Sequence, residues 1–275
     1  MTDRPDISET LASAIRQEGL DTLEGAFVYS GGEELSKPGL GHRHRSRLTL
    51  TDDQGAEHEL YLKRYGSEPL GHRLKRLWTH GRFLTPAAVE AGNIRRVLSA
   101  GVATMRVVAW GEEKRPLGGG RSYIVVTAVP GDALERCGAE YIERCRTEGR
   151  DDRIECLTGA IADMVRRLHA AGLVHRDLYS SHVFLHESGG TPELYLIDLA
   201  RVFAPRLRVF RWRVKDLAQL KYSMPPWWVE NCWEGLLSRY LGDSADDVGR
   251  WSQAIDRKVL AMQRQAQRRR RRSER

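Results

Sequence analysis

The sequence predicts an α+β protein of two lobes, an N-terminal antiparallel β-sheet lobe with one helix and a mainly helical C-terminal lobe. Short strand-like segments separated by turns occupy residues 22–129, whereas apolar residues recur at spacings of three and four in the second half of the chain. Pro130-Gly131 interrupts the strand pattern, which indicates a hinge at this point. A chain of 275 residues, 41% of them hydrophobic, is long enough to bury the cores of two such lobes.

Strand-like segments dominate the first lobe. A short apolar run, an alternating run and a segment rich in Leu and Tyr occupy residues 26–30, 47–51 and 59–65. The glycine-containing stretch 37–43 separates the first two segments and is typical of a turn. This order of strand, glycine turn, strand and strand is suited to covering a nucleotide.

One helix in this lobe has clear ends. Thr85 suits the N-cap, a proline follows at the first helical position, and Gly101 comes after the last apolar residues. The helix carries Glu90. Two further strands are expected at residues 102–110 and 122–129, joined by a polar, glycine-rich turn.

The second lobe begins with an amphipathic helix at residues 153–171, ended by Gly172. Its apolar positions are Ile154, Leu157, Ile161, Val165 and Leu168. Two short strands are expected at residues 183–185 and 194–197, and two further helices at 214–222 and 229–240.

Two carboxylates in this lobe have positions suited to phosphoryl transfer. Asp177 lies in His175-Arg-Asp, after the amphipathic helix and before a strand, and Asp198 ends an apolar strand about twenty residues later. A carboxylate at the first position can accept the proton of an attacking hydroxyl. A carboxylate at the second can hold Mg²⁺, and phosphoryl transfer requires both tasks.

This stretch resembles the protein-kinase-like superfamily, whose catalytic loop reads HRDxxxxN and is followed by a metal-binding Asp. Two positions depart from that pattern. His182 stands where the superfamily usually has Asn, and Asp198 lies in Ile-Asp-Leu where the superfamily has DFG.

A narrower resemblance accounts for both departures. The lipopolysaccharide kinase (Kdo/WaaP) family has a loop similar to HRDxYxxHF followed by IDL, and this chain has His175-Arg-Asp-Leu-Tyr-Ser-Ser-His-Val-Phe and Ile197-Asp-Leu. Tyr61-Leu-Lys-Arg-Tyr and Arg213-Val-Lys-Asp-Leu are further matches. The resemblance implies a bilobal protein-kinase-like fold and an ATP-dependent, Mg²⁺-dependent kinase. Its acceptor would be a sugar hydroxyl, of Kdo or heptose, in the inner core of lipopolysaccharide.

The resemblance also implies roles for individual residues. Lys63 would neutralise the α- and β-phosphates of ATP, and Glu90 would hold its ammonium group in an ion pair. Asp177 would position and deprotonate the sugar hydroxyl. Asp198 would bind Mg²⁺ that bridges the phosphates.

Four other residues have expected roles near these. His182 is a candidate to bind phosphate or metal or to organise Asp198, although neutral imidazole is a poor ligand for Mg²⁺. Gly39 and Gly41 would lie over the phosphates, unless their turn is a plain hairpin. Asp216 is expected to support the catalytic loop through backbone hydrogen bonds, and His175 is expected to be structural.

The formal net charge of +7 is concentrated at one end of the chain. Residues 264–275 contain seven arginines and one glutamate. Such a run is typical of a disordered, solvated end, but it can also bind anionic lipid headgroups. Nucleic-acid binding is not expected, because the body of the chain has no aromatic interleaving or recognised module.

These patterns predict four parts: an N-terminal extension, a nucleotide-covering lobe, a catalytic and acceptor-binding lobe and a basic tail, at residues 1–21, 22–129, 130–263 and 264–275. No secretory signal or membrane-spanning run is present, so we expect a cytoplasmic protein that contacts the inner face of the inner membrane through its tail. The four cysteines match no zinc pattern and are expected to be reduced.

Two alternatives to a lipopolysaccharide kinase are consistent with the residues. One is a kinase for another small molecule, of the aminoglycoside phosphotransferase type, although such enzymes usually have Asn at the position of His182. The other is a pseudokinase, a binding module attached to the membrane by its tail.

Overall fold

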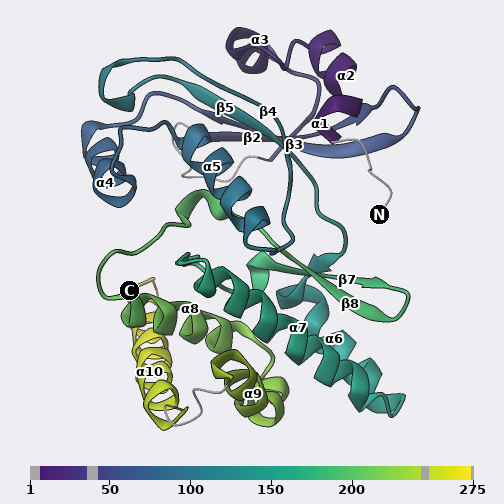
Figure 1. Cartoon of the computed structure of the whole chain (residues 1–275), viewed down its shortest axis with the longest axis vertical. Helices are drawn as coiled ribbons and strands as arrows, with labels where there is room; N and C mark the ends of the chain where they lie inside the picture. The colour runs from purple at the N-terminus through teal and green to yellow at the C-terminus, as the bar shows by residue number, and fades with distance from the viewer. Residues whose placement is uncertain (1–6, 36–42, 243–247, 274–275) are drawn as a thin grey trace. The chain divides into compact units, whose positions relative to one another are not determined.

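The computed structural model describes residues 7–35, 43–242 and 248–273 (Figure 1). The chain divides into two compact units. Unit 1 comprises residues 1–98 and 104–129, and unit 2 comprises residues 99–103 and 130–275. Unit 1 is built on a β-sheet and unit 2 is mainly helical, which confirms the α+β class and the kinase-like fold expected from the sequence.

Unit 1 contains a five-stranded antiparallel sheet with the order β1-β2-β3-β5-β4. Long ladders join its central strands. The strands β2 and β3 pair along their whole length, and β3 also pairs with β5 on its other edge. The strands are β1 (Glu33–Glu34), β2 (Arg43–Thr51), β3 (Glu57–Tyr65), β4 (Val107–Glu112) and β5 (Ser122–Thr127).

The two faces of this sheet have different partners. Leu60 and Leu62 of β3 join an apolar cluster with residues of α2 (Ala12–Gln17) and α3 (Leu23–Val28) and with Leu11, which follows the short helix α1 (Ile7–Thr10). Lys63 and Tyr65 reach α5 (Pro86–Ser99) on the opposite face. Because side chains alternate along a strand, one strand both anchors the core and presents a lysine to α5. Figure 1 shows α1 to α3 on one side of the sheet and α5 on the other.

Residues 26–30 do not form the expected strand. They fall in and after α3, whose first turn is capped by Thr22, since the Gly25 N–H donates to Thr22 Oγ1 over 3.1 Å. The apolar residues Leu23, Ala26 and Phe27 recur at helical spacing and pack on the sheet. A five-residue apolar run does not distinguish a strand from a short buried helix, and the cap decides between them. The strand expected from residue 102 begins only at Val107.

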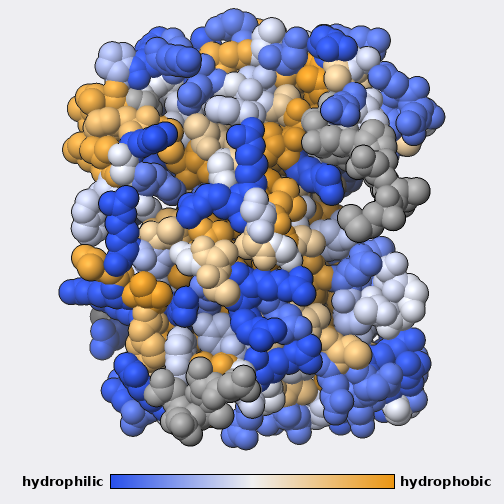
Figure 2. All heavy atoms as spheres, in the orientation of Figure 1, coloured by the Kyte–Doolittle hydropathy of each residue, from blue (hydrophilic) through white to orange (hydrophobic). Residues whose placement is uncertain are grey.

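A further helix of unit 1, α4 (Leu70–His80), was not expected from the sequence. It has no buried residue. Figure 2 shows apolar residues gathered on the surface at the upper left, near the place of α4 in Figure 1.

Unit 2 surrounds a small three-stranded sheet with helices. The strands are β6 (Asp132–Ala133), β7 (Val183–Ser188) and β8 (Thr191–Leu196), in that order. The helices are α6 (Leu134–Thr147), α7 (Asp151–Ala170), α8 (Val209–Ser223), α9 (Pro226–Leu241) and α10 (Val248–Ser273). The amphipathic pattern assigned to residues 153–171 corresponds to α7, whose apolar stripe is buried.

The arginines from Arg264 to Arg272 belong to a helix and not to the disordered end that such a run is typical of. The helix α10 continues to Ser273, and Arg268 to Arg272 are exposed on it. Among the described helices, none has the length and apolar character needed to cross a membrane. The four cysteines are unbonded, as expected.

Candidate functional site

In unit 1, an ion pair joins the central sheet to α5. Lys63 Nζ lies 2.5 Å from Glu90 Oε1, and Glu90 is completely buried. The Tyr65 hydroxyl donates to the other carboxylate oxygen of Glu90 over 2.7 Å. Burial, reinforced by the charge of Glu90, raises the pKa of Tyr65 well above its ordinary value, so this phenol remains a donor. Both carboxylate oxygens of Glu90 therefore have partners. Oε1 holds the Lys63 ammonium group, and Oε2 accepts the Tyr65 hydroxyl, which keeps the carboxylate in place.

The two glycines assigned to a phosphate-covering turn, Gly39 and Gly41, lie outside the described residues.

In unit 2, a buried aspartate holds the backbone of the loop that contains Asp177. Asp216, on α8, accepts the backbone N–H of His175 over 2.6 Å and that of Arg176 over 2.8 Å. Its carboxylate also lies 3.3 Å from His169 Nε2. Arg176 has a φ of 74°, a left-handed conformation that costs free energy in a non-glycine residue unless its surroundings enforce it. These contacts confirm the supporting role expected for Asp216.

The Asp177 side chain follows directly and faces two cations. Its Oδ2 lies 2.5 Å from Arg201 Nη1, and its Oδ1 lies 3.9 Å from Lys215 Nζ. Lys215 also donates to the carbonyl of Arg176. Burial lowers the pKa of Lys215, while the charge of Asp177 opposes that shift. The carboxylate is only partly exposed, so its orientation is set by these contacts.

Arg201 and Lys215 are site residues that the sequence motifs do not indicate. Arg201 belongs to a run of basic residues whose identities are not diagnostic, and Lys215 lies in the Arg213-Val-Lys-Asp-Leu match. The position of Lys215 could have indicated its role, because it immediately precedes Asp216, which is expected to support the loop that contains Asp177. No local pattern distinguishes Arg201 from its neighbours.

Asp198, the second candidate carboxylate, lies beside His182. His182 Nδ1 lies 2.7 Å from the Asp177 carbonyl, which can only accept, so Nδ1 carries the proton. The opposite nitrogen, Nε2, then lies 3.7 Å from Asp198 Oδ2. Asp198 follows β8 in a left-handed conformation with a φ of 58°. A single hydrogen bond thus fixes which nitrogen of His182 faces Asp198.

The donor set at Asp198 fits Mg²⁺. This ion prefers oxygen ligands and is usually bound by one or two carboxylates, with waters and substrate phosphates completing its shell. Asp198 supplies such a carboxylate, and about a third of its side chain is exposed. Within the described residues, no group of three or more His, Cys, Asp or Glu side chains could enclose a metal. His182 Nε2 is adjacent, but imidazole is a secondary ligand for a hard ion.

His175 is a structural residue, as expected. It is completely buried, and its Nε2 lies 2.9 Å from the carbonyl of Ile197. Burial lowers the pKa of His175, so the ring is neutral at neutral pH and Nε2 donates this hydrogen bond. The histidine therefore joins the loop that contains Asp177 to the segment that precedes Asp198.

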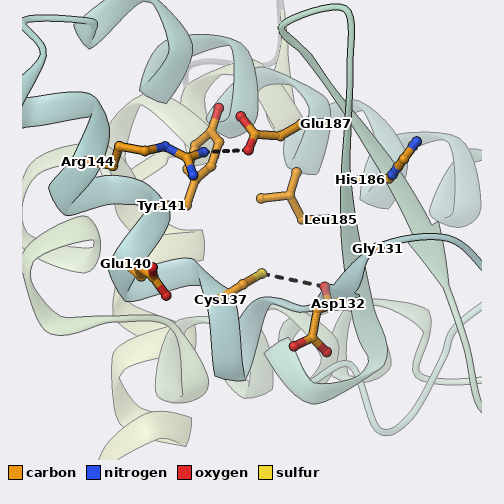
Figure 3. Close-up of a pocket in the computed structure, with 9 residues that line it drawn as sticks. All are labelled: Gly131, Asp132, Cys137, Glu140, Tyr141, Arg144, Leu185, His186 and Glu187. Atoms are coloured by element: carbon orange, nitrogen blue, oxygen red, sulfur yellow. Dashed lines mark hydrogen bonds and ion pairs between the residues drawn. The ribbon is translucent and has the colours of Figure 1, made fainter.

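Unit 2 also contains a surface hollow of about 200 Å³ between α6 and the small sheet. The ion pair of Arg144 with Glu187 lies at one end, and the Cys137 thiol donates to the Asp132 carbonyl at the other (Figure 3). Neither Asp177 nor Asp198 lines this hollow. The hollow is therefore a different site from the one that contains Asp177 and Asp198.

Comparison with known proteins gives one family. The model of the lipopolysaccharide kinase (Kdo/WaaP) family matches residues 41–240. The chain is 36% identical over 185 residues to the lipopolysaccharide core heptose(I) kinase WaaP of Pseudomonas aeruginosa, an alignment that covers 65% of this chain and 66% of that protein. It is 35% identical over 184 residues to the protein of the same name from Escherichia coli, covering 65% and 68%. The chain thus spans about two thirds of the length of these relatives.

The fold is also similar to a solved structure. The structure described as WaaP in complex with acyl carrier protein is 27% identical and has a TM-score of 0.62. The match covers 89% of this chain and 96% of that one.

Proposed function

Because the chain belongs to the lipopolysaccharide kinase (Kdo/WaaP) family, we propose that it transfers the γ-phosphate of ATP to a sugar hydroxyl of the lipopolysaccharide inner core. The observation that carries the proposal is the environment of Asp177. Its loop backbone is fixed by a buried carboxylate, and its side chain faces two cations.

Asp177 is the proposed general base. Its carboxylate orients the acceptor hydroxyl and accepts the hydroxyl proton as the hydroxyl oxygen bonds to the γ-phosphorus, while the bond from that phosphorus to the β-phosphate oxygen breaks and ADP leaves. Arg201 and Lys215 lie on the two oxygens of this carboxylate. Their charges also suit the negative charge that is spread over a transferring phosphoryl group.

The remaining assigned residues bind and orient the nucleotide in this proposal. Lys63 neutralises the α- and β-phosphates of ATP, and Glu90 holds the Lys63 ammonium group ready. Asp198 is the proposed Mg²⁺ ligand. When bound, Mg²⁺ neutralises charge on the phosphates and helps to align them. His182 is the second candidate ligand of this ion, because its Nε2, opposite the protonated Nδ1, offers a lone pair beside the Asp198 carboxylate.

The names of the relatives favour heptose as the acceptor sugar. Both relatives described above are named heptose(I) kinases, whereas the family description includes Kdo kinases as well. We therefore propose heptose as the first acceptor to test and Kdo as the second.

Two partners are proposed beyond the acceptor. The exposed arginines of α10 suit contact with anionic lipid of the inner membrane. The acyl carrier protein in the structurally related complex makes such a carrier protein a second candidate partner of this chain. If removal of residues 264–275 left membrane association unchanged at low salt, the lipid role of these arginines would be wrong.

An acceptor comparison tests the proposed activity. The purified protein is incubated with labelled ATP, Mg²⁺ and one of three acceptors: a heptose-containing core glycolipid, a glycolipid ending in Kdo, or an aminoglycoside. Label on the heptose glycolipid is the expected result. Transfer only to the aminoglycoside would favour the small-molecule alternative, and nucleotide binding without transfer to any acceptor would favour the pseudokinase.

A further inference from the structure

The helix α4 presents its apolar residues to solvent. Exposed fractions are 57% for Leu70, 57% for Leu74 and 92% for Trp78. These residues share one face, because they are four positions apart. A surface helix normally turns its apolar stripe toward the core, but α4 has no buried residue.

The polar side of α4 attaches the helix to unit 1. Arg73 Nε donates to the Glu68 carbonyl over 2.7 Å, and Arg76 Nη2 lies 2.5 Å from Glu68 Oε2. Arg73 also approaches the carbonyl of Gly119, in the loop between β4 and β5. Leu117, in the same loop, is 49% exposed. The fold thus holds α4 by its arginines and leaves Leu70, Leu74 and Trp78 exposed.

The charged residues of α4 itself are all basic, and the nearest acidic residue in the sequence, Glu68, is paired with Arg76. No Asp or Glu occurs from residue 69 to residue 89, whereas the same stretch contains Arg73, Lys75, Arg76 and Arg82. Lys75 is exposed and lies one helical turn before Trp78. A short helix with Leu and Trp on one face and only basic charges on the other is typical of helices that lie in the interface of an anionic membrane.

We propose that α4 is a membrane-interface helix that inserts Leu70, Leu74 and Trp78 into an anionic lipid surface. Tryptophan suits the headgroup level because its ring is amphipathic, and Lys75 can reach lipid phosphates from the edge of the apolar face. This surface belongs to unit 1 and is distinct from the arginines of α10. The proposal goes beyond the phosphotransferase activity and does not depend on it.

Vesicle binding tests the proposal without nucleotide or glycolipid. Vesicles of equal parts phosphatidylglycerol and phosphatidylcholine are mixed with the full chain and sedimented. The variant Leu70→Ser/Leu74→Ser/Trp78→Ser is expected to bind at least about tenfold more weakly than the wild type, because little apolar area remains to insert. Leu207→Ser, which changes a 79% exposed leucine in unit 2, is the matched control and should bind normally. Unchanged binding by the triple variant would overturn the proposal.

A second measurement locates the inserted residue. Phosphatidylglycerol with brominated chains quenches tryptophans that enter the bilayer. The wild type should be quenched, whereas Trp78→Phe, which retains an apolar face, should bind the vesicles but lose most of the quenching. Equal quenching of both proteins would contradict insertion of α4. If the wild type ignored anionic vesicles and used this face to bind an acidic protein or a second copy of itself, the lipid assignment would be wrong.

Discussion

The Asp216 carboxylate accepts the backbone N–H of His175 over 2.6 Å, 41 residues away in the sequence. A second N–H, that of Arg176, reaches the other oxygen of the same carboxylate. This buried residue therefore sets the backbone that carries Asp177. Removing it should affect both the stability of unit 2 and the geometry of the loop.

We expect Asp216→Ala to lower the free energy of unfolding by about 2–4 kcal/mol, because it leaves buried donors without an acceptor. Asp216→Asn should cost less, since the amide oxygen still accepts one of the two backbone N–H groups. Denaturant unfolding measures both. Asp163→Ala, which removes a carboxylate paired with Arg239 on the surface, is the control and should cost less than about 1 kcal/mol. A similar cost for all three variants would contradict this role.

We expect the stability costs of removing Lys63 and Glu90 to be non-additive. Glu90→Leu or Lys63→Met alone leaves one buried charge without its partner, and each should cost about 3–5 kcal/mol. The double variant should be nearer to the wild type than the sum of the single changes predicts, because no unpaired charge remains. Thermal or denaturant unfolding of the four proteins tests this, and additive costs would contradict it. All three variants should lose phosphate transfer, since the proposed phosphate ligand or its support is missing.

Sequence patterns predicted the parts of the fold that have periodic signals. The alternation near residues 47–51 and 59–65 corresponds to β2 and β3, and the spacing from Ile154 to Leu168 corresponds to α7. Residues 26–30 were misassigned because a short apolar run has no distinguishing period. The helix α4 was missed because its apolar face is not buried, so the pattern could not be connected with a core.

The candidate site was predicted only where its residues lie in motifs. His175, Asp177, His182 and Asp198 are close in the sequence, and the loop geometry brings them together in unit 2. Arg201 reaches Asp177 across a turn after Asp198, and this approach depends on tertiary packing. The resemblance suggested the role of Glu90, but its hydrogen bond from Tyr65 becomes visible only when strand and helix are placed together.

Arg201 should contribute to transfer more than to folding. Its side chain is half exposed, so Arg201→Ala should change stability by less than about 1 kcal/mol. We expect kcat to fall by about tenfold to hundredfold, because a cation beside the base and the transferring group is lost. Steady-state kinetics measure this effect. Arg206→Ala, an exposed arginine of the same run, is the matched control and should retain full activity.

His175 predicts a pH dependence of stability. Burial holds its pKa below the ordinary value of 6.5, so the unfolded chain takes up a proton that the folded chain does not. The free energy of unfolding should therefore fall as pH decreases below 6.5 toward the folded pKa. Unfolding at a series of pH values should show a shallower decrease for His175→Gln than for the wild type. Parallel curves would contradict the assignment of a buried, neutral ring.

Phosphate transfer by Asp177→Asn tests most directly whether Asp177 is the general base. This change keeps the size of the side chain but removes the proton acceptor, so nucleotide binding should persist while kcat falls at least about a hundredfold. Asp163→Asn, on the surface of α7, is the matched control and should transfer phosphate normally. Labelled ATP and the purified heptose core glycolipid provide the assay. Labelled glycolipid is expected from the wild type and the control but almost none from Asp177→Asn. Transfer by Asp177→Asn at the wild-type rate would show that Asp177 is not the general base.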